Sequence, residues 1–232
     1  MHKIPSQTQL VEQVYESILD AICQGDLQPN ERVTQEGLAE RLGVSRQPIL
    51  QAFQLLKRQG FIEESGRKGV IITPLDPQKL VQLYQVRAAL DALAVRAAAR
   101  RVYELGPQVC ETEGQALVAQ GRAAAARQDV KALLQLDMAF HQWLYSLSGN
   151  PMIAETTALH WQHIRRTMSS ILKHDVRTFD GVWDEHHAIL QAVLQGDEDR
   201  AGFLAQQHAE SAAEHLARIL EGSEHASKRK QA

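Results

Sequence analysis

Apolar residues recur every three or four positions in three short segments near the start of the chain, which predicts three amphipathic helices. The first spans residues 7–24 and ends before Gly25. The second ends at Gly43, and Ser45 is placed to cap the third. The second and third segments, within residues 33–61, predict a helix-turn-helix. The apolar positions of the three helices are Leu10, Val14, Ile18, Ile22, Leu38, Ala39, Leu42, Ile49, Ala52, Phe53 and Leu56.

A β-hairpin is predicted directly after the third helix. Residues 61–64 and 70–73 are rich in apolar and β-branched side chains, and they flank a glycine-containing turn at residues 65–69. The tip of the hairpin carries Arg67 and Lys68, which suits contact with the sugar-phosphate backbone of DNA. The order helix, helix, helix, hairpin predicts a winged helix-turn-helix domain.

The pattern after the hairpin is helical only. Pro74 and Pro77 end the strand pattern, and Asp76 can cap the helix that follows. Leu83, Val86, Leu90, Leu93 and Ala97 form an apolar stripe along this helix. Six helices are expected in all. The first spans about residues 77–105, and the second begins after residue 107 and ends at about 127. The others are expected at about 130–147, 152–172, 179–195 and from 197 onwards.

These patterns predict a mainly α protein of two domains. The first is an N-terminal winged helix-turn-helix domain in residues 1–74, and residues 75–79 form a linker. The second is a C-terminal all-α helical-bundle effector domain in residues 80–222. Residues 223–232 contain the basic run Lys228-Arg229-Lys230 and are expected to be a disordered basic tail.

Composition and charge narrow the class of protein. The chain has 232 residues, of which 44% are hydrophobic and 23% charged, values of a globular protein with one large or two small domains. A net charge of only −3 favours DNA contacts on a small face over non-specific coating of DNA. Two cysteines provide no disulfide framework, and no signal peptide or membrane-spanning apolar run is present. A cytoplasmic protein with no membrane partner is therefore expected.

Candidate DNA contacts gather at the start of the third helix, whose N-terminal residues would enter a major groove of double-stranded DNA. Arg46 and its polar neighbours lie where such a helix meets phosphates and base edges. Together with the hairpin tip, the candidate DNA-binding residues are Ser45, Arg46, Gln47, Gln51, Arg67 and Lys68.

Polar residues interrupt the apolar stripes of the second domain. Asp137 and His141 are four residues apart on one predicted helix, and His186 and His208 lie on the stripes of two later helices. Three neutral imidazoles and a carboxylate could satisfy one another around a divalent cation. Spacing alone also allows core histidines hydrogen-bonded to a carboxylate. Other candidate ligands at helical spacing are His160, His163, His187 and His215.

The N-terminal segment resembles the DNA-binding domain of GntR-type bacterial regulators, from about Thr8 to Pro74. The resemblance rests on GDLQPN at residues 25–30, LAERLGVSRQP at residues 38–48 and the closing glycine of the wing. The family usually has Thr, Arg and Glu where this chain has Gln47, Leu50 and Gln51. The resemblance implies a homodimer on a pseudo-palindromic operator, and the replaced arginine implies an unusual operator or weaker binding.

Residues from about 78 to 220 resemble FCD, the all-helical effector domain of the FadR subgroup. The matching motifs are RAALD at 87–91, DMAFH at 137–141, EHHAI at 185–189 before Gly196-Asp197, and His208. In metal-binding members of the family the Asp and three His are ligands. The resemblance therefore implies a divalent metal at Asp137, His141, His186 and His208, with zinc expected and nickel or another metal also suited.

The two resemblances together imply a ligand-responsive transcriptional regulator rather than an enzyme. Most relatives repress and are released by a small effector, here expected to be an organic acid. Arg87 and Arg165 are candidates to bind its carboxylate through their planar guanidinium groups. Pairing of Arg87 with Asp91 on the same helix, and a surface ion pair for Arg165, are the structural alternatives.

Two other functions remain open from the residues. An Asp with three His could bind zinc and activate water, as in a metal-dependent hydrolase. Four protein ligands, however, leave no open position in a tetrahedral site, and no motif for a separate general base accompanies them. A DNA-binding module without an effector is the second alternative.

Overall fold

The computed structural model describes the backbone of residues 7–66, 69–172 and 181–231, and the side chains of residues 9–66, 69–172 and 181–222. The chain divides into two compact units, residues 1–75 and 76–232. Each unit is described by itself below. Within the described residues, no helix combines the length and the apolar character needed to cross a membrane.

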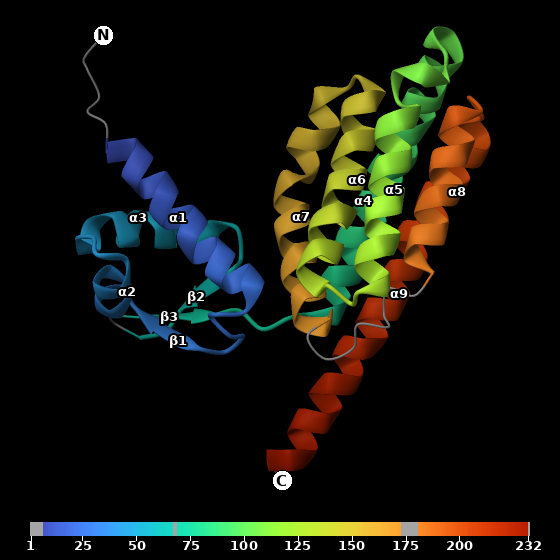
Figure 1. Cartoon of the computed structure of the whole chain (residues 1–232). Helices are drawn as coiled ribbons and strands as arrows, with labels where there is room; N and C mark the ends of the chain where they lie inside the picture. Colours follow the sequence, from blue (N-terminus) through green and yellow to red (C-terminus); the bar gives the residue numbers. More distant parts are fainter. Residues whose placement is uncertain (1–6, 67–68, 173–180, 232) are drawn as a thin grey trace. The chain divides into compact units, whose positions relative to one another are not determined.

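The first unit is a winged helix-turn-helix, as the sequence predicts (Figure 1). Its elements are α1 (Gln7–Gln24), β1 (Arg32–Thr34), α2 (Gln35–Leu42), α3 (Arg46–Arg58), β2 (Ile62–Glu64) and β3 (Gly69–Ile72). The three strands form an antiparallel sheet in the order β1-β3-β2. Strand β1 was not predicted, because three residues are too few to show an alternating pattern. It extends the hairpin by pairing Val33 with Val70.

Local capping sets the geometry of the helix-turn-helix. The Thr34 hydroxyl accepts a hydrogen bond from the backbone N–H of Gly37 and caps α2. Gly43 then ends α2 in a left-handed conformation, with φ of 66°. Ser45 is at the predicted N-cap position of α3, but its side chain makes no capping hydrogen bond there. The buried residues of α3 are Pro48, Ile49, Ala52, Phe53 and Leu56, so the opposite face of the helix remains exposed.

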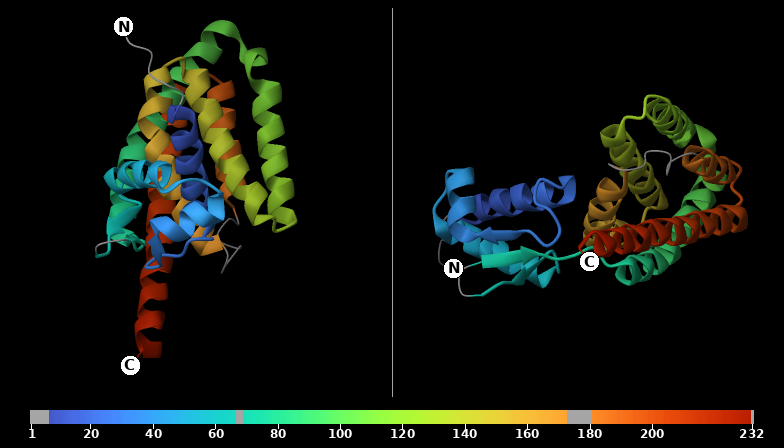
Figure 2. Two further views of the ribbon diagram at one scale, coloured as in Figure 1. Left: turned by 90° about the vertical axis from the view of Figure 1, so that its left-hand side faces the viewer. Right: turned by 90° about the horizontal axis from the view of Figure 1, so that it is seen from below.

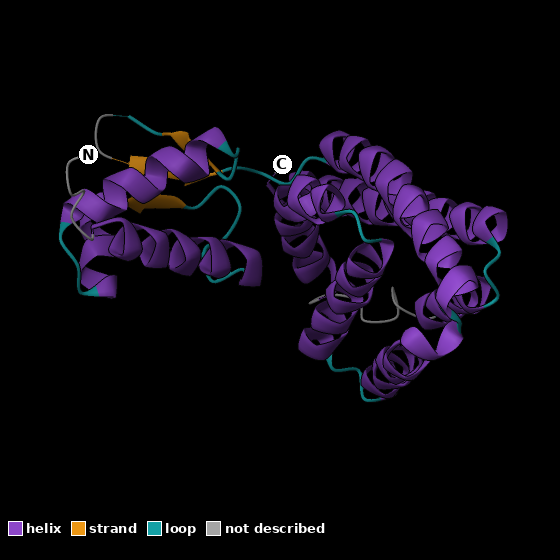
Figure 3. Ribbon diagram, turned by 90° about the horizontal axis from the view of Figure 1, so that it is seen from above, coloured by secondary structure: helices purple, strands orange, loops and turns teal. Residues whose placement is uncertain are grey.

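The second unit is helical throughout its described residues, and the strands in Figure 3 all belong to the first unit. Its elements are α4 (Pro77–Leu105), the short 3-10 helix η1 (Pro107–Val109), α5 (Glu111–Ala126), α6 (Val130–Ser148), α7 (Pro151–Leu172), α8 (Val182–Leu194) and α9 (Glu198–Gln231). Helix α4 runs beside α9 and also packs against α6, α7 and α8 (Figure 2). The helix predicted at 179–195 begins at Val182 in the structure, and residues 179–180 lie outside the described part.

Helix α4 leaves one apolar stripe partly exposed. Its buried stripe includes Tyr84, Arg87, Asp91 and Val95. On the opposite side, 46% of Val86 and 51% of Leu93 remain exposed. The apolar stripe of α4, defined as Leu83, Val86, Leu90, Leu93 and Ala97, is therefore half-buried or exposed.

Two predicted boundaries differ in the structure. Helix α4 begins at Pro77, with Asp76 accepting hydrogen bonds from the backbone N–H groups of the first turn, so the predicted linker at 75–79 is shorter. Helix α9 continues to Gln231, through most of the segment predicted as a basic tail (Figure 1). The sequence after Gly222 contains no proline and is rich in Ala, Glu, Lys and Arg, which favour helix.

Candidate metal centre and DNA-binding face

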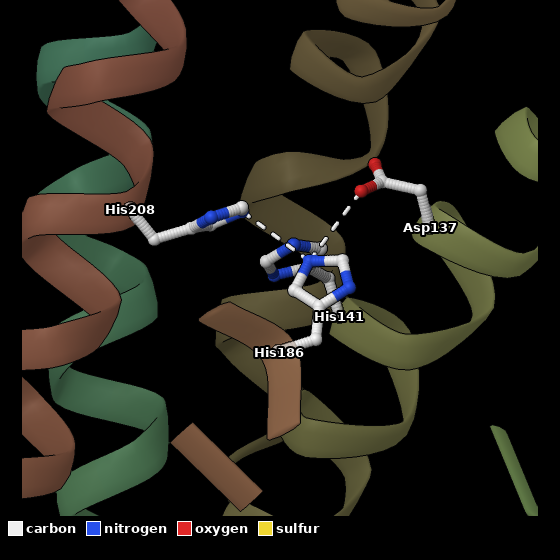
Figure 4. Close-up of side chains that lie close together, drawn as sticks. All are labelled: Asp137, His141, His186 and His208. Atoms are coloured by element: carbon white, nitrogen blue, oxygen red, sulfur yellow. Dashed lines mark hydrogen bonds and ion pairs between the residues drawn. The ribbon is translucent and has the colours of Figure 1, made fainter. Parts of the chain in front are cut away.

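Three helices bring four polar side chains together inside the second unit (Figure 4). Asp137 and His141 come from α6, His186 from α8 and His208 from α9. All four are buried, and one ligand atom of each lies within 4.8 Å of the others. These residues, the Asp/His cluster, are the four predicted metal ligands. The alternative candidates His160, His163, His187 and His215 are not part of the cluster.

The spacing of the donor atoms suits a common cation. His186 Nε2 lies 3.3 Å from His208 Nε2 and 3.5 Å from Asp137 Oδ1. Two donors bound to one zinc ion at the usual bond length, with tetrahedral angles, are about 3.4 Å apart. Both measured distances therefore match the separation expected between two donors to one zinc ion.

Glu185 determines which nitrogen of His208 faces the cluster. Its Oε2 lies 2.6 Å from His208 Nδ1. An ionised carboxylate can only accept a hydrogen bond, so Nδ1 carries the proton and Nε2 presents its lone pair to the cluster. Carboxylates hold metal-binding histidines in this way. The sequence showed Glu185 as part of a motif but gave it no role, because the contact joins α8 to α9.

Burial keeps two imidazole rings of the cluster neutral. Burial lowers the pKa of His141 and of His186 well below the usual value, with further lowering by the Arg87 charge on His141 and by His208 on His186. Both rings are therefore neutral, as metal ligands must be. Burial raises the pKa of Asp137, although the charge of nearby Arg87 lowers it.

Two polar atoms of the cluster have no hydrogen-bond partner among the described residues. They are Asp137 Oδ2 and His186 Nδ1. A buried polar atom without a partner costs about 1–3 kcal/mol, and a cation bound to the carboxylate would remove that cost for Asp137. The donor set of three imidazoles and one carboxylate, its spacing and its unpaired oxygen all fit a divalent metal ion.

Arg87 is buried beside the Asp/His cluster. Its Nε donates to Asp91 Oδ2 at 3.1 Å, and its Nη2 lies 2.6 Å from His141 Nε2. The guanidinium group lies over the Trp161 ring, 4.3 Å from its centroid. Burial lowers the pKa of Arg87, but the combined effect of Asp91, Tyr84, Asp137 and Tyr145 leaves the pKa raised, so the group stays charged. The predicted pairing of Arg87 with Asp91 is therefore present, and Tyr145 donates to the other oxygen of Asp91.

The second candidate effector residue is less enclosed. Arg165 is half-buried on α7, and its Nη1 donates to Gln162 Oε1 at 3.4 Å. Its neighbour Arg166 is buried, with 5% of its surface exposed. Helical spacing alone did not show which of these two arginines enters the core.

The predicted DNA-binding residues of α3 share an exposed face. Ser45, Arg46, Gln47 and Gln51 are all exposed, and Arg46 forms an ion pair with Glu36 of α2. An exposed ion pair of this kind is weak, so DNA can displace it. The other two predicted DNA contacts, at residues 67–68, lie outside the described residues.

Comparison with known proteins identifies both units of the chain. The profile of the FCD domain matches residues 82–211, and that of the gntR family of bacterial regulatory proteins matches residues 10–72. The chain is 26% identical to the uncharacterized HTH-type transcriptional regulator YdhC of Bacillus subtilis, over 94% of this chain and 96% of that protein. It is 25% identical to a protein of Paenarthrobacter nicotinovorans named as a probable transcriptional repressor of the D-xylose utilization operon, over 84% of each.

Solved structures show the same fold. A GntR transcriptional regulator from Rhodococcus sp. RHA1 superposes with a TM-score of 0.72 at 22% identity, covering 89% of this chain and 96% of that one. At this level of identity the likeness concerns the fold alone.

The contact between Glu185 and His208 generates a first prediction. Replacing Glu185 with Gln removes the negative charge that holds the Nδ1 proton of His208, so zinc affinity should fall about ten-fold. Isothermal titration of purified protein with zinc measures the change. Glu214→Gln, an equally conservative change at an exposed position of α9, is the control and should bind zinc as the unaltered protein does. Equal affinity of all three proteins would remove Glu185 from the site.

Proposed function

The chain belongs to the GntR family of bacterial regulatory proteins and carries an FCD domain, and on that premise we propose that it is a repressor controlled by a small organic acid. As a member of this family it is a transcriptional regulator. The observation that carries the finer proposal is the buried Asp/His cluster lying against the charged guanidinium group of Arg87. We propose repression because the P. nicotinovorans relative is named as a probable repressor. We propose that the protein is cytoplasmic, because the proposed function requires access to the bacterial DNA.

We assign a divalent metal to the Asp/His cluster, with zinc favoured by its three nitrogen donors and one oxygen donor. A bound metal would supply positive charge and Lewis acidity to an anionic ligand. The chain's own residues do the rest: Glu185 orients His208, and Asp91 balances the Arg87 charge.

We propose that Arg87 links effector binding to the metal ligands. Its guanidinium group is shared between Asp91 and His141, so a carboxylate that binds Arg87 competes with His141 for the same N–H groups. Arg165, half-buried on α7, is the second candidate for the carboxylate. An effector changes DNA binding only if it binds one arrangement of the protein better than the other, and movement of α6 through His141 is the route we propose.

We propose that a second copy of the chain packs against the apolar stripe of α4. Val86 and Leu93 are two helical turns apart on one side of α4, and about half of each is exposed. A two-fold axis would place the same stripe of a second chain against it, because a symmetric dimer uses one surface patch twice. Such a dimer would present two α3 helices to the two halves of a pseudo-palindromic operator.

Among the described residues, the carboxylates beside the cluster give no support to catalysis. Glu185 is bonded to His208, and Asp91 is bonded to Arg87 and Tyr145. Neither carboxylate is placed to act as a general base on a metal-bound water. A regulatory role for the site is therefore preferred to hydrolysis.

The metal assignment predicts a contrast between two pairs of histidines. The double variant His186→Ala with His208→Ala should lose bound metal and should no longer gain thermal stability from added zinc. The matched double variant His187→Ala with His215→Ala changes neighbouring histidines outside the cluster and should keep both properties. Elemental analysis and thermal unfolding provide the two measurements. Full metal content in the first variant, or its loss in the second, would show that the ligands are wrongly assigned.

The DNA-binding face predicts that Arg46→Ala weakens binding to the intergenic DNA beside the gene by about ten-fold or more, since one good base contact is worth about 1–3 kcal/mol. Arg127→Ala removes the same charge from an exposed position of the second unit and serves as the control. Fluorescence anisotropy at one fixed salt concentration measures both, because salt alone changes such affinities. Undiminished affinity of the Arg46 variant would exclude this residue from DNA recognition.

The apolar stripe predicts that Leu93→Asp converts a dimer to a monomer, because the charge would have to be buried between two chains. Leu159→Asp, at an exposed leucine of α7, is the control and should leave the dimer intact. Sedimentation velocity reports the mass of each protein. A Leu93 variant that remains dimeric would move the interface elsewhere, and a monomeric unaltered protein would rule out the proposed dimer.

A further inference from the structure

The exposed face of α3 carries amides and one leucine where base edges would be read. Gln47, Gln51 and Gln54 are spaced four and three residues apart, so they lie within about 60° of one another around the helix. Leu50 lies beside them, with 37% of its surface exposed, and all three glutamines are exposed. These four residues are called the reading face of α3.

Among the residues that the structure describes, cations near the reading face are few and lie at its margins. Arg46, in the first turn, is paired with Glu36. Lys57, near the other end, is paired with Glu64 of β2. Arg58 shares the side of the glutamines but lies in the last turn, away from the N-terminal residues that reach base edges. Arg46 is therefore the one cation at the N-terminal end of the described part of α3.

The chemistry of this face selects bases. A glutamine amide donates and accepts two hydrogen bonds with N7 and N6 of adenine, whereas guanine is read chiefly by Arg or Lys at O6 and N7. A leucine side chain cannot form a hydrogen bond with either purine, but it can contact the C5-methyl group of thymine in the major groove. Each A·T pair offers both partners, one on each strand. The reading face thus matches consecutive A·T pairs.

From this match, and given the DNA-binding function proposed above, we infer that the operator half-site is A·T-rich where the reading face lies. Gln47 and Gln51 read adenines and Leu50 reads a thymine methyl group. A G·C pair is expected at a single position per half-site, under Arg46.

The contact inferred between Leu50 and a thymine methyl group can be tested most directly. Uracil differs from thymine at this position only by the missing methyl group, so replacing one base tests one contact. Burial of a methyl-sized group is worth about 0.8 kcal/mol, which corresponds to an affinity change of about four-fold.

Selection of binding sequences from a random duplex library by the full-length protein provides the first measurement. Enriched sequences should be pseudo-palindromic, with adjacent A·T pairs in each half-site. With Gln51→Ala, the preference for adenine at one of these positions should fall about ten-fold. Gln206→Ala, at an exposed position of α9 in the second unit, should select the same sequences as the unaltered protein.

The second measurement replaces each thymine of the best sequence with uracil in turn. At one position per half-site the unaltered protein should lose affinity about four-fold, and Leu50→Ala should show no loss there. Enriched G·C pairs across the half-site, or equal affinity for every uracil duplex, would overturn the inference while leaving a DNA-binding regulator. Failure to enrich any duplex would overturn the proposed DNA binding as well.

Discussion

Burial of the Asp/His cluster is the constraint on which the second unit depends. One carboxylate and three imidazoles meet where α6, α8 and α9 converge, and each polar atom there needs a partner. Glu185 satisfies the outer nitrogen of His208, and Arg87 satisfies one nitrogen of His141. The unpaired oxygen of Asp137 shows that protein groups alone do not complete the set among the described residues. A divalent cation is the group that this donor set fits.

The same constraint shapes the surface of α4. Arg87 and Asp91 are buried and hydrogen-bonded to each other beside the cluster, so the side of α4 that enters the core is partly polar. Its apolar stripe then faces outwards, where a second chain could cover it. Helix α4 thus joins the two proposals, since one side holds the arginine proposed to bind the effector and the other is the proposed dimer surface. A change at Arg87 could reach that proposed surface through a single helix.

Sequence patterns predicted helices well and contacts between helices poorly. Capping residues such as Asp76, with glycines such as Gly43, gave most boundaries within a few residues. Strand β1 was missed because its three residues carry no periodic signal. The Asp/His cluster needed the family resemblance, since spacing along each helix left other histidines open. Contacts such as Glu185 with His208 join separate helices, and only the folded structure brings them together.

Metal analysis of the purified, unaltered protein by X-ray absorption spectroscopy tests the central claim most directly. We predict one divalent metal ion per chain, bound to three imidazole nitrogens and a carboxylate oxygen. Protein that holds no metal as purified and takes up neither zinc nor nickel would contradict the claim, as would a metal bound through sulfur.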